Sequence, residues 1–227
     1  MRGAPISCVL LGDGRSDRAL IPVLEWLLRD RLPGRAAAFA WADLERLPRP
    51  PKGLKERMKC SIVQNPSCEI LFVHRDAERE TREQRVAEIV QASAEVAWQD
   101  GEPPILIATI PVRMLEAWLL IEEAAIRKAA SNPGGKRVLR LPECKRLEQI
   151  PDPKQQLYDL LRDACELQGR RRGKFEKTLH RAVHDVARYI DDFSPLRNLS
   201  AFRAMEQEIS QRVVPKFGIL TTKQVGK

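Results

Sequence analysis

Short apolar runs that end in turn or charged residues recur in the first half of the chain and predict buried strands. They occupy residues 6–12, 36–42, 69–74 and 105–110. Between them, apolar positions repeat every three or four residues, as on one face of a helix. This alternation of strands and helices predicts the α/β fold class, with a parallel sheet covered by helices on both faces.

The helices expected between these strands are bounded by capping and turn residues. The first begins at Ser16 or Asp17 and stops at Pro33-Gly34, because serine and aspartate cap helices and this dipeptide ends them. Three others are expected at residues 54–63, 81–98 and 114–130.

Beyond residue 135 the pattern is helical only. Helices are predicted at about 153–167, 174–191 and 198–213, separated by Gly173 and by Phe193-Ser194-Pro195. The sequence therefore predicts two parts, which are an α/β domain over residues 1–130 and a basic α-helical extension over 131–227 that packs on it.

Positive charge is concentrated in the second part. Residues 1–130 hold 19 Lys+Arg against 19 Asp+Glu, and residues 131–227 hold 20 against 12, so the extension carries all of the net charge of +8. Such a region attracts polyanions, which makes nucleic acid the expected partner. Basic helices that only keep a protein soluble are the alternative. The residues expected to contact phosphates are Arg75, Arg113, Arg170, Arg171, Arg172, Lys174 and Lys177.

The N-terminal apolar run is too short for a signal peptide, and no stretch approaches the ~20 apolar residues of a membrane span. The five cysteines are scattered and form no C-x-x-C pair, so neither a disulfide framework nor a zinc ribbon is indicated. We expect reduced thiols, a cytoplasmic location and no membrane partner.

Acidic residues follow three of the predicted strands. Asp13 follows the first, Asp76 and Glu78 follow the third, and Glu116 lies shortly after the fourth. The carboxyl ends of parallel strands meet at one edge, where ligands bind. Carboxylates gathered there repel one another unless a hard cation such as Mg²⁺ or Mn²⁺ binds them. Glu116 and Asp17 have a second interpretation, as acids that favour a helix N-terminus.

Histidines offer two further hypotheses. His74 lies beside the acidic residues, where it either transfers a proton or holds a neighbouring carboxylate by a hydrogen bond. His180 and His184 are spaced like metal ligands on a helix, but no third ligand accompanies them. We interpret that pair as part of a solvated helix face.

Two segments resemble motifs of a known family. Leu11-Gly12-Asp13-Gly14-Arg15-Ser16-Asp17 resembles the acidic element that opens toprim domains, and Phe72-Val73-His74-Arg75-Asp76-Ala77-Glu78 resembles their Asp-x-Asp element. Aspartate stands where that family has glutamate in the first, and Asp76-x-Glu78 is our preferred alignment of the second. With Ile110–Trp118 and Ser194–Arg197, the chain is most similar to toprim-like proteins often encoded beside an SMC-type ATPase.

This resemblance implies a toprim/Rossmann-like sheet and a metal-dependent nuclease related to the overcoming-lysogenization-defect group, acting on DNA or RNA. It further implies a role in bacterial antiphage defence with a separate SMC-like or AAA-type ATPase. The metal ligands would be Asp13, Asp76, Glu78 and Glu116. Two alternatives stay open, a catalytically weak subunit that binds the partner ATPase and a phosphatase or phosphotransferase. A homodimer is also left open.

Overall fold

The chain folds around a parallel four-stranded sheet in the computed structural model, which describes residues 4–98 and 102–218. The strand order is β2-β1-β3-β4, with β1 Ile6–Leu11, β2 Ala37–Trp41, β3 Ile70–His74 and β4 Ile105–Thr109. Every residue of β3 is buried, which explains the apolar run Ile70–Val73 that precedes His74. The predicted α/β fold class, with a parallel sheet, is confirmed.

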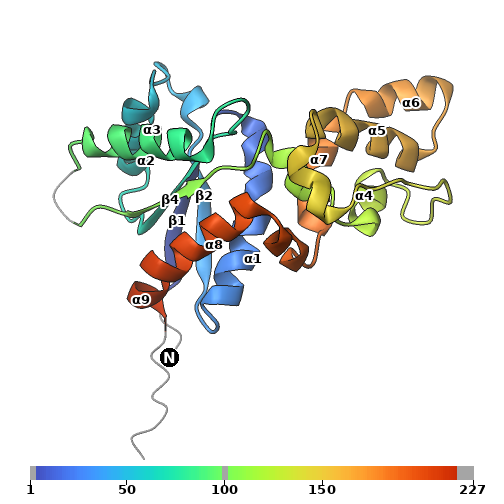
Figure 1. The fold of residues 1–227 in the computed structure, drawn as a ribbon. Coiled ribbons are helices and arrows are strands. Elements are labelled where there is room, and N and C mark those ends of the chain that lie inside the picture. The colour runs from blue at the N-terminus through green and yellow to red at the C-terminus, as the bar shows by residue number, and fades with distance from the viewer. Residues whose placement is uncertain (1–3, 99–101, 219–227) are drawn as a thin grey trace, which may run out of the picture.

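Helices cover both faces of this sheet (Figure 1). On one face, α2 (Leu54–Gln64) and α3 (Arg82–Ala94) pack against the alternate side chains that include Val9 and Leu71. On the other face, α1 (Ile21–Arg31) and α8 (Ser200–Arg212) pack against those that include Leu10 and Phe72. Successive residues of a strand point to opposite faces, so each strand contributes to two cores.

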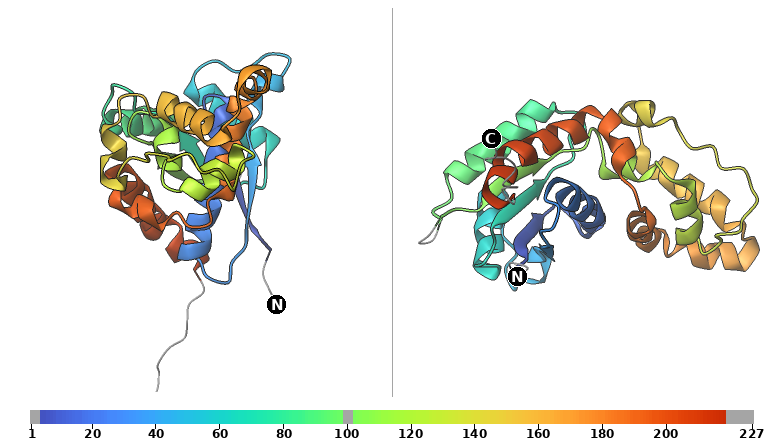
Figure 2. Two further views of the ribbon diagram at one scale, coloured as in Figure 1. Left: turned by 90° about the vertical axis from the view of Figure 1, so that its right-hand side faces the viewer. Right: turned by 90° about the horizontal axis from the view of Figure 1, so that it is seen from below.

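A group of helices, which we call the helical lobe, extends to one side of the sheet (Figures 1 and 2). It contains α4 Glu123–Ala129, α5 Pro153–Cys165, α6 Gly169–Glu176 and α7 Leu179–Tyr189. Short helices lie in the connections: η1 Arg15–Leu20, η2 Leu44–Arg46, η3 Leu115–Leu119, η4 Cys144–Gln149, η5 Ser194–Asn198 and α9 Val214–Phe217.

After the lobe, the chain returns to the sheet through α8. This helix lies beside α1 and β4, and its Phe202 ring meets Trp26 at 6.5 Å and Trp118 at 5.5 Å between centroids. The carboxylate of Glu206 on α8 forms ion pairs with Arg31 at 2.6 Å and with Arg197 at 2.7 Å. Residues from both ends of the chain thus share one hydrophobic core.

Three predicted helices differ in the structure. The helix expected at 114–130 is wrong as one element, because Glu122 takes an extended backbone between η3 and α4. The one expected at 174–191 is also two helices, α6 and α7, and Gly173 lies inside α6 instead of ending a helix. Arg15–Leu20 forms a 3₁₀ helix before α1 begins.

Candidate active site

The loop after β1 is organised by the side chain of Asp17. Its Oδ2 accepts hydrogen bonds from the backbone N–H of Asp13 at 2.7 Å and of Gly14 at 3.1 Å, while Ser16 Oγ donates to its Oδ1. Gly12 makes this approach possible, because a Cβ there would lie 2.6 Å from that Oδ2 atom. Asp17 therefore does more than favour the start of a helix, because its side chain also holds the loop that carries Asp13.

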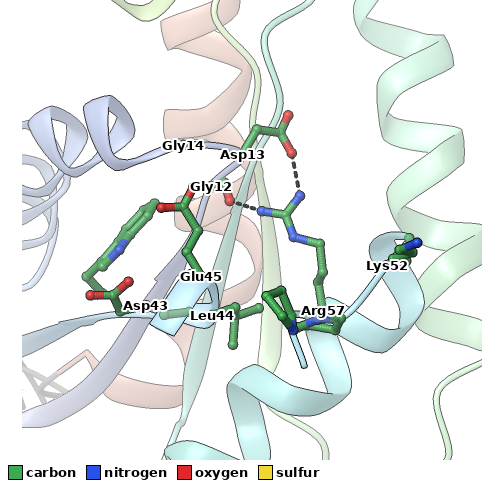
Figure 3. Close-up of a pocket in the computed structure, with 13 residues that line it drawn as sticks. Gly12, Asp13, Gly14, Asp43, Leu44, Glu45, Lys52 and Arg57 are labelled. Carbon is green, nitrogen blue, oxygen red and sulfur yellow. Dashed lines mark hydrogen bonds and ion pairs between the residues drawn. The ribbon is translucent and has the colours of Figure 1, made fainter. Parts of the chain in front are cut away.

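Asp13 itself is held by two arginines. Arg57 of α2 places Nη1 2.6 Å from Oδ1, and Arg75 places Nε 3.2 Å from Oδ2. Figure 3 shows the Arg57 guanidinium also donating to the carbonyl oxygen of Gly12, in a cavity of about 360 Å³ between the ends of β1 and β2. The negative charge of Asp13 is thus balanced by these two arginine side chains.

His74, the last residue of β3, is fixed in orientation by the neighbouring strand. Its Nδ1 lies 3.0 Å from the carbonyl oxygen of Thr109, which can only accept, so Nδ1 carries the hydrogen. Its Nε2 lies 3.4 Å from Asp76 Oδ1 and 3.8 Å from Asp17 Oδ2. The ring is 2% exposed and stands between two carboxylates.

Asp76 is the least compensated of these carboxylates. Its Oδ1 is buried and forms no hydrogen bond within the described residues. Burial raises the pKa of Asp76 to about 6; His74 opposes this rise, and the carboxylates of Glu116 and Asp17 add to it. We call Asp17, Asp76 and Glu116 the acidic cluster, because the first and the last both act on Asp76. Its excess negative charge makes it a candidate site for a cation.

Glu116 closes the cluster on the side of the helical lobe. It is 3% exposed, and its Oε1 lies 3.5 Å from Nζ of Lys154 at the start of α5. Burial lowers the pKa of Lys154, but Glu116 raises it, and the net change is upward. The interpretation of Glu116 as a helix-start acid fits its place in the first turn of η3, but its side chain is buried at the site.

The turns after β3 and β4 lie side by side. The backbone N–H groups of Arg75, Ala77 and Glu78 donate to the carbonyl groups of Thr109, Pro111 and Arg113, which continues the pairing of the two strands. Glu78 and Arg113 have φ values of 54° and 63°, a left-handed conformation that is strained for residues with a Cβ. Such strain often clusters at functional sites.

The structure brings most of the predicted site residues together. Asp13, His74, Arg75, Asp76 and Glu78 line one cavity of about 320 Å³, together with Asp17 and Arg85. Glu116 lies close enough to Asp76 to raise its pKa. Arg113 borders a neighbouring cavity beside Glu78.

The basic run of α6 is placed elsewhere. Its residues are Arg170, Arg171, Arg172, Lys174 and Lys177, of which the last follows the helix. The helix lies at the end of the lobe away from the sheet (Figure 1). This run is exposed but does not border the acidic cluster.

Comparisons with protein-family models, with curated proteins and with solved structures give no match to this chain. None of the helices within residues 4–98 and 102–218 is long and apolar enough to span a bilayer.

The donor chemistry of the site suits Mg²⁺ or Mn²⁺, which prefer carboxylate oxygens. The present arrangement does not form a complete site, because no three His, Cys, Asp or Glu side chains of the described residues are grouped to hold a metal. Asp13 is paired with arginines and Glu116 with Lys154. The unpartnered Oδ1 of Asp76 is the atom that fits a cation, and Asp13 would have to leave its arginines to join it.

The sequence did not predict four residues of this site, which are Asp17, Arg57, Arg85 and Lys154. Arg57 and Lys154 come from α2 and α5, and only the folded structure brings them to the strand ends. Asp17 had a signal, since it follows Asp13 by four residues in the segment that resembles a toprim motif. Its position in a first helical turn favoured the simpler interpretation.

Proposed function

We propose that this protein is a Mg²⁺- or Mn²⁺-dependent phosphodiesterase that cleaves nucleic acid, as toprim-like nucleases do. The observation that carries the proposal is Asp76, whose Oδ1 is buried and accepts no hydrogen bond within the described residues, at the carboxyl edge of a parallel sheet. It borders the same cavity as Asp13, Arg75 and Arg85. Ligands of open parallel sheets bind at this edge.

Asp76 and Asp13 would hold the cation, with Glu78 and Glu116 in support. When bound, the ion polarises a phosphoryl oxygen and lowers the pKa of a water molecule. Arg75 and Arg85 line the cavity and bind the phosphate, since guanidinium groups pair well with its oxygens. In this proposal, Arg75 exchanges the Asp13 carboxylate for the substrate phosphate.

We assign His74 a positioning role. Its Nδ1–H is committed to Thr109, and its Nε2 faces Asp76 and Asp17 at the distances given above. The residue is only 2% exposed, so its ring offers little surface to a substrate in the cavity that it helps to line. Of the two hypotheses for this histidine, the geometry therefore favours the one in which it holds a carboxylate. In this role the ring is the imidazolium, whose Nε2–H donates to the carboxylate.

A thermal melt and a cleavage assay together test the proposal. Metal stripped with EDTA and then replaced by Mg²⁺ or Mn²⁺ should raise the melting temperature, because a ligand that binds only the folded state stabilises it. The same metals should support cleavage of labelled DNA or RNA. Asp76→Asn should lose both effects, whereas Asp163→Asn, on the exposed surface of α5, should lose neither. Cleavage that persists in Asp76→Asn would refute the proposal.

One observation favours a second candidate, a catalytically weak subunit that binds a partner ATPase in the cytoplasm. Asp13 is neutralised by Arg57 and Arg75, so the metal site is incomplete as it stands. The five cysteines are free thiols, which supports a reducing compartment. Absence of cleavage with either metal, combined with stable binding to an ATPase encoded beside it, would select this candidate.

A further inference from the structure

A further cavity, of about 770 Å³, lies between the start of α1 and helix α7 of the lobe. We call it the basic cleft and define it by six side chains: Arg15 and Arg18 of η1, and His180, Arg181, His184 and Arg188 of α7. Two carboxylates, Glu25 and Asp185, also line it. The cleft therefore has an excess of positive charge.

The amphipathic pattern of α7 directs its basic residues into this cleft. Leu179, Val183 and Val186 are buried in the core, while His180, His184 and Arg188 recur every four residues on another face. The same spacing suggested a solvated face from the sequence alone, and His180 and Arg188 are exposed. This face also lies opposite η1, where it forms one wall of a cavity.

Much of the positive charge in the cleft is weakly compensated. Arg18 and Arg181 are exposed and form no ion pair within the described residues. Arg15 pairs with Glu45 at 3.1 Å, and Arg188 approaches Asp185 at 3.9 Å, but both arginine side chains are more than half exposed. Exposed pairs such as these contribute little and exchange readily for another anion.

The pKa of His184 is lowered in part by this excess of positive charge. Burial lowers its pKa, and the nearby positive charge of Arg18 lowers it further, with His180 acting in the same direction. An additional cation is therefore disfavoured inside the cleft, whereas an anion would be stabilised there. Arginine-lined walls without an aromatic platform suit phosphate groups better than bases.

The basic cleft and the acidic cluster are linked by η1. This helix begins directly after Gly14 of the Asp13 loop, and Asp17 on it belongs to the acidic cluster, while Arg15 and Arg18 belong to the cleft. Six residues of 3₁₀ helix extend about 12 Å, at about 2 Å per residue.

We propose that the basic cleft binds the sugar-phosphate backbone of the nucleic-acid substrate and leads the strand to the acidic cluster. This inference rests on the proposed nuclease function for its substrate class. The α6 run, which the sequence suggested for this task, lies farther along the lobe (Figure 1). Backbone contacts carry no sequence information, so the cleft binds without regard to base sequence.

Binding is measured by fluorescence anisotropy with a labelled DNA strand, its duplex and an RNA of the same sequence. Every protein carries Asp76→Asn so that the probe stays intact. Adding Arg18→Gln with Arg181→Gln should weaken binding at least about 10-fold and lower the slope of log affinity against log salt by about 1 to 2. The control pair is Arg170→Gln with Arg171→Gln, which removes the same charge from exposed positions of α6.

The control pair should change affinity by less than about 2-fold, because it lies outside the cleft. Equal losses in both pairs would show a diffuse electrostatic attraction and overturn the proposal. A greater loss in the α6 pair would assign the backbone to α6 instead. Competition by inorganic phosphate, beyond that of chloride at matched ionic strength, would show a site for free phosphate and would also overturn it.

A second assay separates the cleft from the proposed function. Bis(p-nitrophenyl) phosphate is a small phosphodiester that needs only the cavity beside Asp76. With Asp76 intact, the cleft variant should hydrolyse it like the wild type while losing nucleic-acid cleavage. Wild-type protein that hydrolyses no phosphodiester, but binds nucleic acid through the cleft, would refute the nuclease and retain the cleft. Normal cleavage of nucleic acid by the cleft variant would refute the cleft alone.

Discussion

Gly12 shows how closely the loop after β1 is packed. A Cβ on this residue would lie 2.6 Å from Asp17 Oδ2 and 2.9 Å from Cη2 of Trp41. We predict that Gly12→Ala lowers the free energy of unfolding by about 1 to 3 kcal/mol, as overpacking does, and displaces Asp17. Gly14→Ala is the matched control, because its Cβ would meet nothing closer than Ser16 Oγ at 3.8 Å. Urea unfolding with equal losses in both variants would contradict this account.

Asp76 gives a pH dependence in metal-free protein. Its folded pKa of about 6 lies above the ordinary value of 3.8, so the folded state binds more protons than the unfolded state between these values. The free energy of unfolding therefore falls as the pH rises through this range, by on the order of 2 kcal/mol. Asp76→Asn lacks this loss.

The variant should accordingly gain stability relative to the wild type at neutral pH and not below about pH 4. Chemical unfolding in EDTA at several pH values measures the difference. A stability difference between the two proteins that stays constant across the range would show that Asp76 titrates normally.

The sequence predicted the candidate site from charged residues that follow strands. Asp13, His74, Asp76 and Glu78 border one cavity because the ends of β1 and β3 are adjacent in the sheet. Their partners had no such signal. Arg57 follows Asp13 by 44 residues and lies near the start of α2. Its contact with Asp13 therefore depends on how α2 packs against β1.

Among the elements, α8 is attached to α1 by a charged junction around Glu206. This residue is 9% exposed and meets Arg31 at 2.6 Å and Arg197 at 2.7 Å, while Arg197 also covers the ring of Trp26 at 5.0 Å. We predict that Glu206→Gln lowers the free energy of unfolding by about 1 to 3 kcal/mol, because two guanidinium groups lose their shared carboxylate.

Glu208→Gln is the matched control for this junction. Glu208 lies on the same helix and pairs with Arg212 at 3.1 Å, an (i, i+4) pair whose arginine side chain is 48% exposed, and at the longer distance of 3.9 Å with Arg82. Its loss should cost less than about 0.5 kcal/mol. Denaturant midpoints that change equally in the two variants would show that the Glu206 junction does not attach α8.

Strands were easier to predict than helix boundaries. An apolar run such as Ile70–Val73 is typical of a strand that is buried on both faces. Leu115–Leu119 has no exposed face at all, so its periodicity could not reveal that the helix stops before Glu122. The break at residues 177 and 178 was likewise hidden, because the apolar spacing continues from Phe175 to Leu179.

At the scale of the whole molecule, charge composition predicted an anionic partner but not where it binds. The excess of basic residues after position 130 is a property of the sequence. The basic cleft, however, joins α7 to Arg15 and Arg18, which belong to a segment with no net excess. A cleft made by two distant segments follows from packing, so no local pattern could predict it.

The return of α8 to the sheet leads to a prediction about the separate stability of the two parts. A chain that ends at residue 130 would leave Trp26 and Trp118 without Phe202, and one face of the sheet without the helix that covers it beside α1. Exposure of that apolar surface costs about 25 cal/mol per Å², so we predict that this fragment aggregates or unfolds without cooperativity. A chain of residues 1–218 should melt cooperatively as a single species. Size-exclusion chromatography and thermal unfolding compare the two, and a monodisperse, cooperatively folding 1–130 fragment would show that the α/β part is independent of α8.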